Sequence, residues 1–345
     1  MSERIERLRP SLEEPLLVAS GANIRYLIGF TSSNAALVVE PERTLLFSDF
    51  RYAEAGRAVE GVEFVETKRE VWGDIAEHLS GPIGFEPQVL TYSQYEVLAG
   101  NGLELVPRTG LVEALRAIKE DHELDAIRAA GALTSQAYER FAEEGFTGRT
   151  ERELAWRLDS LFHELGAAGP AFETIVAAGP NGARPHARPS DRVIQPGEAI
   201  VIDAGALVDG YCSDCTRTFL TGPLPDRLQE AYDVCHQAQL AGLDAARAGT
   251  TGADTDAAAR TVIDDAGFGD HFGHGLGHGV GLEIHEAPRL GRESTDTLAA
   301  GNVVTIEPGI YLEGAFGVRI EDIVVVTEDG ADRLNRSTRD LQIVG

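Results

Sequence analysis

Four acidic residues in the C-terminal half of the 345-residue chain interrupt segments that otherwise have the pattern of buried strands. Asp203 closes the apolar run AIVID, and Asp214 follows in GYCSDCTRT. Glu307 comes directly after VVTI, and Glu321 stands in GVRIEDIVVV. Carboxylates are almost never fully buried unless they are paired or bind a metal. A fold that uses these segments as strands must therefore supply cations for the carboxylates.

The spacing of the first two acids predicts a hairpin. Gly205 and the Asp209-Gly210 pair are turn residues between Asp203 and Asp214. A hairpin there would place both carboxylates on neighbouring strands, facing the same side. Buried side by side they would repel, and one would keep its proton unless a cation were bound. A single Asp at a strand end is usually a turn or cap residue, so the four acids together carry the metal interpretation.

Histidines are concentrated between these acids. The Gly-rich stretch HFGHGLGHGVGLEIHE contains His271, His274, His278 and His285. Glycines flank His274 and His278 and allow backbone and ligand to approach closely. Four carboxylates and one neutral imidazole carry a charge that two divalent cations balance. This oxygen-rich donor set favours Mn²⁺, with Co²⁺ or Fe²⁺ as alternatives, and two such ions can share a hydroxide and polarise a carbonyl.

Composition excludes several other functions. The net charge of −26 argues against a nucleic-acid partner, which would need a basic patch. No apolar run reaches about 18 residues, so we expect no membrane span, and the charged N-terminus lacks the apolar core of a signal peptide. Three cysteines suit a reducing compartment, and we expect a cytoplasmic protein. Only two lysines occur, Lys68 and Lys119. This acidic, lysine-poor composition fits either a high-salt cytoplasm or the codon bias of a GC-rich genome.

Cys212 and Cys215 form a C-x-x-C around Asp214, a pattern that also occurs in redox and zinc sites. If this segment is a strand, the two side chains point to opposite faces and cannot act as a pair. We interpret them as small strand residues beside a ligand. Cys235 lies in a helical pattern and is expected in the core.

Two domains are predicted, an α/β domain at 1–118 and an α+β domain at 119–345. Leu111–Glu144 contains no proline and predicts a helical bridge into the second domain. Thr150 and Glu153 form a capping-box pattern ahead of a helix at 154–165. The periodicity predicts strands at 15–20, 35–40, 44–49, 63–67, 82–87, 198–208, 210–220, 302–312 and 317–327, and further helices at 51–59, 71–80, about 224–247 and 253–266.

The segments IDAGALVDGYCSDCTRT, HGLGHGVGLEIHE, EPGIY and GVRIED resemble the pita-bread metallopeptidase family, which includes methionine aminopeptidase, Xaa-Pro aminopeptidase, prolidase and creatinase. SGANIRYLIGFTSSNAALVV and LLFSDFRY resemble the creatinase-type N-terminal domain, which accompanies creatinase and the proline-specific members. The resemblance implies a pita-bread catalytic domain at 119–345 behind a smaller α/β creatinase-like domain at 1–118.

The resemblance implies five metal ligands. Asp203 would chelate one ion, Asp214 and Glu321 would bridge two ions, and His278 and Glu307 would complete the second. A bridging hydroxide would attack the scissile carbonyl, and Glu307 would also shuttle the proton.

The resemblance also implies a substrate pocket around the metals. His285 matches the family histidine that steadies the carbonyl or tetrahedral intermediate, and His186 matches a pocket histidine. His274 and Arg319 match positions at the proline side of the scissile bond. The hydroxyl of Tyr311, in EPGIY, is expected to reach the site.

The N-terminal LIGF…SDFRY pattern resembles that of the short bacterial and archaeal Xaa-Pro peptidases, which are named for either of two activities. Of these we predict an Xaa-Pro aminopeptidase acting on short proline-containing peptides. An Xaa-Pro dipeptidase (prolidase) is the alternative; it needs a positive group against the free carboxylate, and Arg319 fits both enzymes. Creatinase uses no metal, methionine aminopeptidase lacks the N-terminal domain, and a binding-only relative would be expected to have lost ligands. Proline-specific relatives are usually dimers, so the resemblance implies a homodimer in which Asn23–Ser33 and Asp49–Tyr52 form part of the rim of the partner's site.

Overall fold

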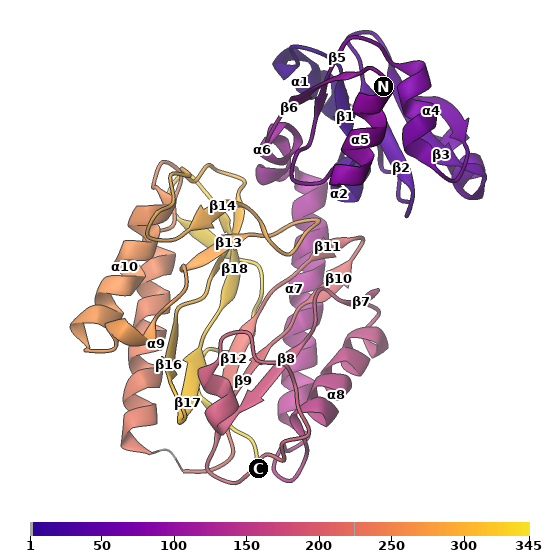
Figure 1. Cartoon of the computed structure of the whole chain (residues 1–345). Helices are drawn as coiled ribbons and strands as arrows, with labels where there is room; N and C mark the ends of the chain where they lie inside the picture. Colours follow the sequence, from indigo (N-terminus) through magenta and orange to yellow (C-terminus); the bar gives the residue numbers. More distant parts are fainter. Residues whose placement is uncertain (1–2, 224) are drawn as a thin grey trace. The chain divides into compact units, whose positions relative to one another are not determined.

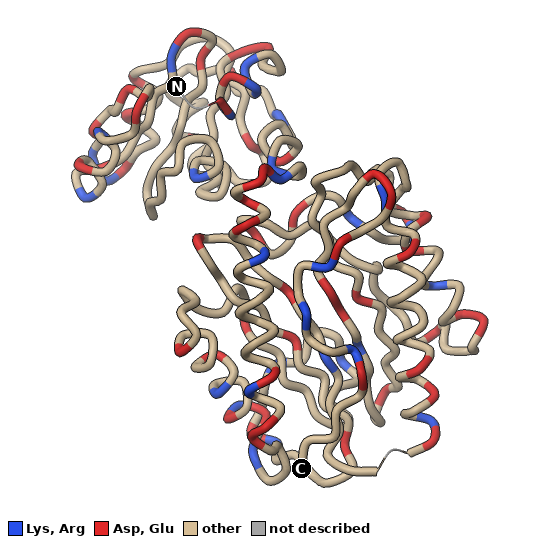
Figure 2. The backbone as a smooth tube through the Cα atoms, turned by 180° about the vertical axis from the view of Figure 1, so that it is seen from behind, with Lys and Arg blue, Asp and Glu red and all other residues tan. Residues whose placement is uncertain are grey.

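The computed structural model describes residues 3–223 and 225–345, and the chain divides into two compact units, Met1–Arg116 and Ala117–Gly345 (Figure 1). The start of the predicted helix at 224 lies outside the described residues, as do residues 1 and 2. Within the described part of the chain, no helix has both the length and the apolar character needed to cross a membrane. Acidic residues are spread over both units (Figure 2). The presence of an acidic residue therefore does not identify a site, and its burial is the distinguishing property.

The first unit is built on a six-stranded mixed sheet in the order β4-β3-β2-β1-β5-β6. β1 pairs antiparallel with β2 and parallel with β5. All five strands predicted here are present, and β1 ends early because the Ser20 side chain caps α2. The predicted helix at 51–59 is a short 3-10 turn followed by α3, and the sequence pattern missed α1, α2, α5 and β6. The elements are α1 (Glu3–Leu8), β1 (Leu16–Val18), α2 (Gly21–Ile28), β2 (Ala35–Val39), β3 (Thr44–Asp49), η2 (Phe50–Tyr52), α3 (Ala53–Arg57), β4 (Glu63–Thr67), α4 (Val71–His78), β5 (Pro82–Phe85), α5 (Tyr92–Gly100), β6 (Glu104–Pro107) and α6 (Leu111–Ala117).

The predicted helical bridge at 111–144 is wrong as one continuous helix. It is broken between α6 and α7 (Asp121–Ala142). Ile118 forms an isolated β-bridge with Asn302, and the Lys119 amide donates to Gly301 O. Glu120 has an extended backbone and exchanges capping hydrogen bonds with Glu123. A new helix, α7, therefore begins at Asp121.

In the second unit, strands lie between two pairs of helices (Figure 1). α7 and α8 (Glu151–Glu164) pack on one side, in a core that includes Phe141, Phe162 and Ile202. α9 (Asp226–Ala245) and α10 (Gly252–Asp265) pack on the other side, in a core that includes Cys235 and Ile306. The Thr150–Glu153 capping box and the burial of Cys235 are confirmed.

Each of the four long strands predicted in this unit is interrupted. The segments 198–208, 210–220, 302–312 and 317–327 each form two shorter strands. The main sheets run in the orders β20-β12-β9-β8 and β14-β13-β15-β18-β19. The strands are β7 (Gly169–Pro170), β8 (Ile175–Ala178), β9 (Ala199–Asp203), β10 (Ala206–Val208), β11 (Tyr211–Cys212), β12 (Thr216–Leu220), β13 (Gly277–Gly279), β14 (Glu286–Leu290), β15 (Val303–Ile306), β16 (Gly309–Leu312), β17 (Phe316–Arg319), β18 (Asp322–Val326), β19 (Ala331–Arg333) and β20 (Gln342–Ile343), with short 3-10 turns η3 (Gly179–Ala183) and η4 (Gly269–His271).

The predicted hairpin between the first two acids is confirmed. β9 pairs antiparallel with β12, and Asp203 lies opposite Thr216. Asp209 and Gly210 turn the chain between β10 and β11 with φ values of 46° and 73°, the left-handed pair of a type I′ turn. A Cβ at Gly205 would lie 1.7 Å from Ser213 O, so only glycine fits at this crossing.

Candidate metal centre

The five predicted ligands come together around one cavity of about 500 Å³ in the second unit. The four acids stand at the strand interruptions, where a side chain can leave the sheet and enter the cavity. Asp203 ends β9, and Asp214 lies between β11 and β12. Glu307 follows β15, Glu321 precedes β18, and His278 is the middle residue of β13.

The donor atoms are close enough to share cations. His278 Nε2 lies 3.3 Å from Glu307 Oε1 and 3.7 Å from Asp214 Oδ2. Ligand atoms of Asp214, His278 and Glu321 all lie within 4.8 Å of one another. The His278 Nδ1–H donates to Gly279 O at 3.0 Å. This hydrogen bond leaves Nε2 as the ring nitrogen that faces the carboxylates.

Two buried carboxylate oxygens of the site are positioned to bind a cation. Among the described residues, Asp203 Oδ1 and Asp214 Oδ1 are buried without a hydrogen-bond partner. Burial, together with the neighbouring carboxylates, raises the pKa of Asp203 and raises that of Asp214 and Glu321 well above the ordinary range. Unsatisfied buried carboxylates are costly, and divalent cations bound by oxygen ligands would satisfy them. The residues present therefore fit a metal centre.

Glu307 and His278 form a separate electrostatic pair. Burial alone would raise the pKa of Glu307, but the hydrogen bond and charge of His278 outweigh it and lower this pKa to about 2. In return, Glu307 raises the pKa of His278 despite the opposing effect of burial. Thr305 Oγ1 also donates to Glu307 Oε1 at 3.2 Å.

Arg319 links the metal centre to the residues expected at the proline side. Its guanidinium donates to Asp203 Oδ2 at 2.7 Å, to Thr216 Oγ1 at 2.9 Å and to the Tyr311 hydroxyl at 2.9 Å. Tyr311 in turn donates to His274 Nε2 at 2.9 Å, because His274 Nδ1–H is used by Gly275 O. Arg319 is buried, and its guanidinium is already hydrogen-bonded to groups of the protein itself.

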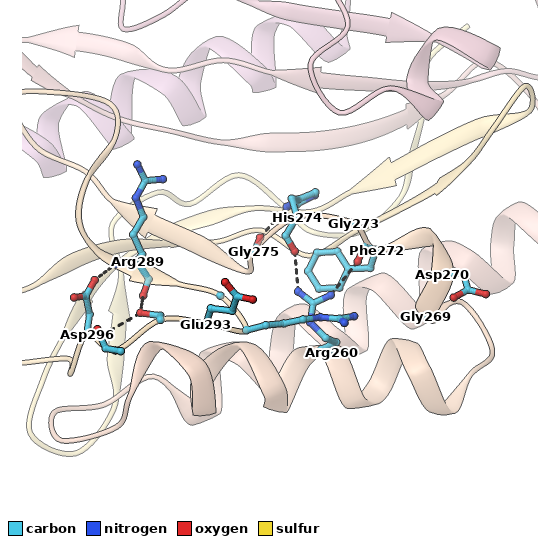
Figure 3. Close-up of a pocket in the computed structure, with 14 residues that line it drawn as sticks. Arg260, Gly269, Asp270, Phe272, Gly273, His274, Gly275, Arg289, Glu293 and Asp296 are labelled. Carbon is cyan, nitrogen blue, oxygen red and sulfur yellow. Dashed lines mark hydrogen bonds between the residues drawn. The ribbon is translucent and has the colours of Figure 1, made fainter. Parts of the chain in front are cut away.

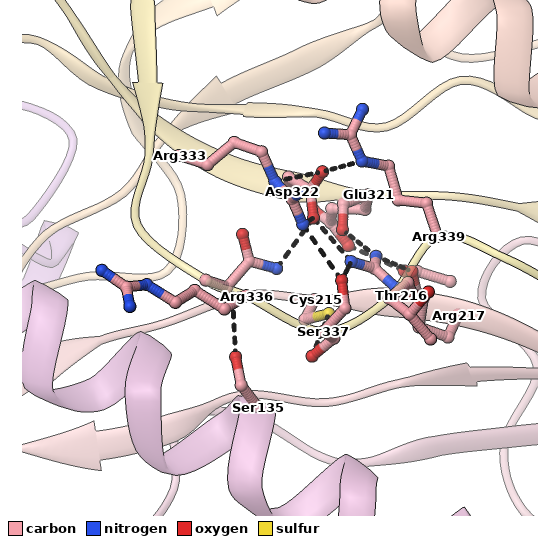
Figure 4. Close-up of polar contacts among 12 residues, drawn as sticks. Ser135, Cys215, Thr216, Arg217, Glu321, Asp322, Arg333, Arg336, Ser337 and Arg339 are labelled. Carbon is pink, nitrogen blue, oxygen red and sulfur yellow. Dashed lines mark hydrogen bonds and ion pairs between the residues drawn. The ribbon is translucent and has the colours of Figure 1, made fainter.

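Thr216 also serves the centre directly. Its hydroxyl donates to Glu321 Oε2 at 2.7 Å while it accepts from Arg319 Nε. Arg217 and Asp322 directly follow Thr216 and Glu321 in the sequence, and their side chains point to the opposite side of the sheet. There, Asp322 is fully buried and forms ion pairs with Arg217, Arg333 and Arg339 (Figure 4). This cluster holds the segment behind Glu321.

The remaining predicted histidines separate into two groups. His285 and His186 line the metal cavity, and the His285 ring meets the His278 ring edge-on with centroids 4.4 Å apart. Burial and the neighbouring His278 lower the pKa of His285. His274 lines the cavity as well, whereas His271 lies in η4 and is not among the lining residues.

Arg289 is a site residue that the sequence analysis missed. It lines the metal cavity and also a second cavity of about 850 Å³ (Figure 3). The two cavities share His274, Gly275, Arg289 and Gly291. Within the described residues, the Arg289 guanidinium has no hydrogen bond or ion pair, although its backbone amide donates to Asp296. In the sequence, Arg289 stands three residues beyond the HE of GLEIHE, but this spacing alone does not identify it as a site residue.

The C-x-x-C cysteines do not form a pair. Cys212 packs with Val280 and Ile323, whereas Cys215 belongs to the core around α7 and α8. Burial raises the pKa of the Cys212 thiol to about 12 and that of Cys215 to about 11. Neither thiol is thus prepared to act as a thiolate ligand.

Comparison with known proteins agrees with this geometry. Residues 125–328 match metallopeptidase family M24, and residues 4–118 match the creatinase/prolidase N-terminal domain. An Xaa-Pro dipeptidase of Pyrococcus furiosus is 36% identical over 351 residues, which cover 99% of this chain and 100% of that protein. The structure of an Xaa-Pro dipeptidase from Bacillus anthracis aligns with a TM-score of 0.96 at 37% identity, covering 99% of each chain. An X-Pro aminopeptidase from Thermotoga maritima aligns with a TM-score of 0.89 at 33% identity, covering 99% of this chain and 100% of that one.

Proposed function

Because the chain belongs to metallopeptidase family M24, we propose that it releases the N-terminal residue ahead of proline from short peptides. The predicted family, the two-part fold and the assignment as a metallo-exopeptidase are confirmed. The observation that carries the proposal is the convergence of five ligand-type side chains on one cavity, in which two buried carboxylate oxygens have no hydrogen-bond partner among residues 3–223 and 225–345.

We assign two divalent ions to this set, and Mn²⁺ matches its oxygen-rich donors best. When bound, such ions polarise a carbonyl and generate a nucleophile from water near neutral pH. The protein's own contribution is orientation, since Arg319, Thr216 and Gly279 O each hold one ligand by a hydrogen bond. The ligands in this proposal are Asp203, Asp214, His278, Glu307 and Glu321.

Two side chains handle charge and protons during hydrolysis. Glu307 accepts the proton of the attacking water and delivers it to the proline nitrogen as the C–N bond breaks, which releases proline as a secondary amine. His285 donates a ring N–H to the carbonyl oxygen while negative charge develops there. Its lowered pKa keeps the ring neutral near pH 7, and a neutral ring still has one N–H donor.

Proline recognition follows from what the substrate lacks. The Xaa-Pro amide has no N–H, and its ring fixes the local backbone, so recognition must use the ring and the terminus. The hydrogen-bonded chain Arg319–Tyr311–His274 gives the cavity a rigid polar wall. Phe172 and Ile175 provide apolar lining in the same cavity.

The second cavity supports the aminopeptidase assignment. It shares the lining residues His274 and Arg289 with the metal cavity, and we propose that it takes the residues beyond the proline. A strict Xaa-Pro dipeptidase is the second candidate, and Arg289 is the observation that favours it. Arg289 lines both cavities, and its guanidinium, which has no partner among the described residues, would bind the carboxylate of a dipeptide.

Hydrolysis of Ala-Pro, Ala-Pro-Ala and Ala-Ala-Ala by the Mn²⁺-loaded protein tests the proposal. We expect Ala-Pro-Ala to be cleaved with a much higher kcat/KM than Ala-Ala-Ala, because alanine leaves the ring pocket partly empty. Equal turnover of these tripeptides would overturn the proline specificity. Cleavage of Ala-Pro alone would select the dipeptidase, and Arg289→Met should then raise KM for Ala-Pro, with Arg292→Met, which lines only the second cavity, as the control.

Two further features belong to this proposal. We place the enzyme in the cytoplasm, which agrees with three free, buried cysteines. We also propose a homodimer in which Asn23–Ser33 and Asp49–Tyr52 contribute to the rim of the partner's site. The exposed aromatic side chain of Phe50 supports a contact at the second of these segments.

A further inference from the structure

A buried ion pair outside the metal cavity joins the segment between α6 and α7 to the start of β14. Lys119 Nζ lies 3.0 Å from Glu286 Oε2, and the two side chains are only 1% and 5% exposed. The other lysine of the chain, Lys68, is 86% exposed. The desolvation cost of a buried ion pair can cancel its attraction, so such a pair is weak evidence for stability alone. Its position suggests another role.

Glu286 closes the turn that carries His285. This turn, residues 280–285, connects β13 with β14. The Glu283 amide donates to Glu286 Oε1 at 3.0 Å. The carboxylate also packs against Gly281, where a Cβ would lie 2.7 Å from each oxygen. Glu286 thus contacts the turn near its beginning and near its end, and His285 is the residue directly before it.

Lys119 anchors this carboxylate to the sheet that carries His278. Its backbone amide donates to Gly301 O at 2.9 Å, and Ile118 bridges to Asn302, directly before β15. β15 pairs with β13 at Gly279. The ion pair therefore connects the end of the 280–285 turn to the sheet of β13 and β15, which also carries His278.

The position of His285 depends on this ion pair because its own side chain makes few contacts. Within the described residues, the His285 ring has no hydrogen bond, and its one ring contact is the edge-on approach to His278. The backbone of the turn therefore sets where the ring lies. We propose that Lys119 and Glu286 are positioning residues whose ion pair holds the 280–285 turn so that His285 faces the substrate carbonyl. This inference rests on the proposed function, in which His285 donates to that carbonyl.

A kinetic cycle on the Mn²⁺-loaded protein tests the inference. Lys119→Met should lower kcat by about tenfold, because a small misplacement of a donor loses part of its effect. KM and bound Mn²⁺ should stay within about twofold of wild type, and Lys119→Arg should restore part of kcat. In a His285→Ala background, Lys119→Met should cause no further loss. Lys68→Met is the matched control and should leave kcat unchanged.

Hydrogen exchange gives a second readout that does not require activity. Amides of residues 280–286 should exchange faster in Lys119→Met than in wild type or Lys68→Met. If Lys119→Met does not fold, the charge-free pair Lys119→Met/Glu286→Gln takes its place in both measurements.

The outcomes separate this inference from the proposed function. Wild-type kcat in His285→Ala would overturn the proposed role of His285, and the exchange measurement would then decide whether the pair holds the turn. Independent, additive losses from Lys119→Met and His285→Ala would overturn the inference while leaving the role of His285 intact. Unchanged exchange in the turn would also overturn it.

Discussion

The guanidinium of Arg319 donates to Oδ2 of Asp203 at 2.7 Å, while Oδ1 of the same carboxylate is buried without a partner among the described residues. One oxygen is thus held by the protein, and the other is left for a metal. Ligands that are oriented in this way bind their metal more tightly than unsupported ligands do.

Replacing Arg319 should therefore weaken metal binding. We expect Arg319→Leu to lower Mn²⁺ affinity by about 10–100-fold, measured by competition with a chelator. The control is Arg188→Leu, because Arg188 is exposed and pairs with Glu173 at the surface. Unchanged affinity in Arg319→Leu would show that Asp203 does not need this support.

The raised pKa values of Asp214 and Glu321 predict that metal stabilises the protein more at high pH. A carboxyl whose pKa is higher in the folded than in the unfolded state makes metal-free protein less stable as pH rises above the unfolded value, about 4. The lowered pKa of Glu307 works in the opposite direction, but only below about pH 4, so it does not affect the range from 5 to 8. The rise in Tm on adding Mn²⁺ to chelator-treated protein should be larger at pH 8 than at pH 5. An equal rise at both values would contradict this electrostatic account.

The chemistry of the site was more predictable than the path of the chain around it. Acids within apolar runs are anomalous wherever they occur, so Asp203, Asp214, Glu307 and Glu321 could be selected from the sequence alone. The same runs were predicted as unbroken strands, because apolar alternation continues across each break. The breaks depend on contacts with distant segments, such as the close approach of Gly205 to Ser213 O.

Long-range pairing also explains what was missed. Lys119 looks like part of a charged surface helix in the sequence, yet its partner Glu286 comes from a strand far along the chain. Arg289 follows a recognisable motif, but only the cavity that it lines shows that it belongs to the site. Neither fact is encoded in local spacing.

The cluster behind Glu321 should be important for stability. Asp322 is fully buried among Arg217, Arg333 and Arg339 (Figure 4). Asp322→Asn would leave three arginines without their shared counter-charge. We expect a loss of about 3–5 kcal/mol, the usual cost of breaking a buried ion pair from one side, measured by urea unfolding in chelator. Asp332→Asn, at an exposed site in β19, is the control, and equal stability of both variants would contradict the prediction.

The proposed dimer can be tested at Phe50, whose side chain is 70% exposed. Phe50→Asp should shift the protein toward monomer in light scattering at micromolar concentration, because a charge would replace an apolar contact. Tyr92→Asp changes a similarly exposed aromatic residue of the same unit outside the proposed rim and should leave the mass unchanged. If the wild-type protein is a monomer, Asn23–Ser33 and Asp49–Tyr52 cannot contribute to the site of a partner.

Metal content measured together with activity tests the central claim most directly. After Mn²⁺ loading and removal of free metal, elemental analysis should find two ions per wild-type chain, and Asp214→Ala should lose both metal and peptidase activity. His285→Ala should keep its metal while losing about 10²–10³ in kcat, since His285 is not assigned as a ligand. Wild-type protein without bound metal, or an Asp214→Ala variant with full activity, would contradict the account.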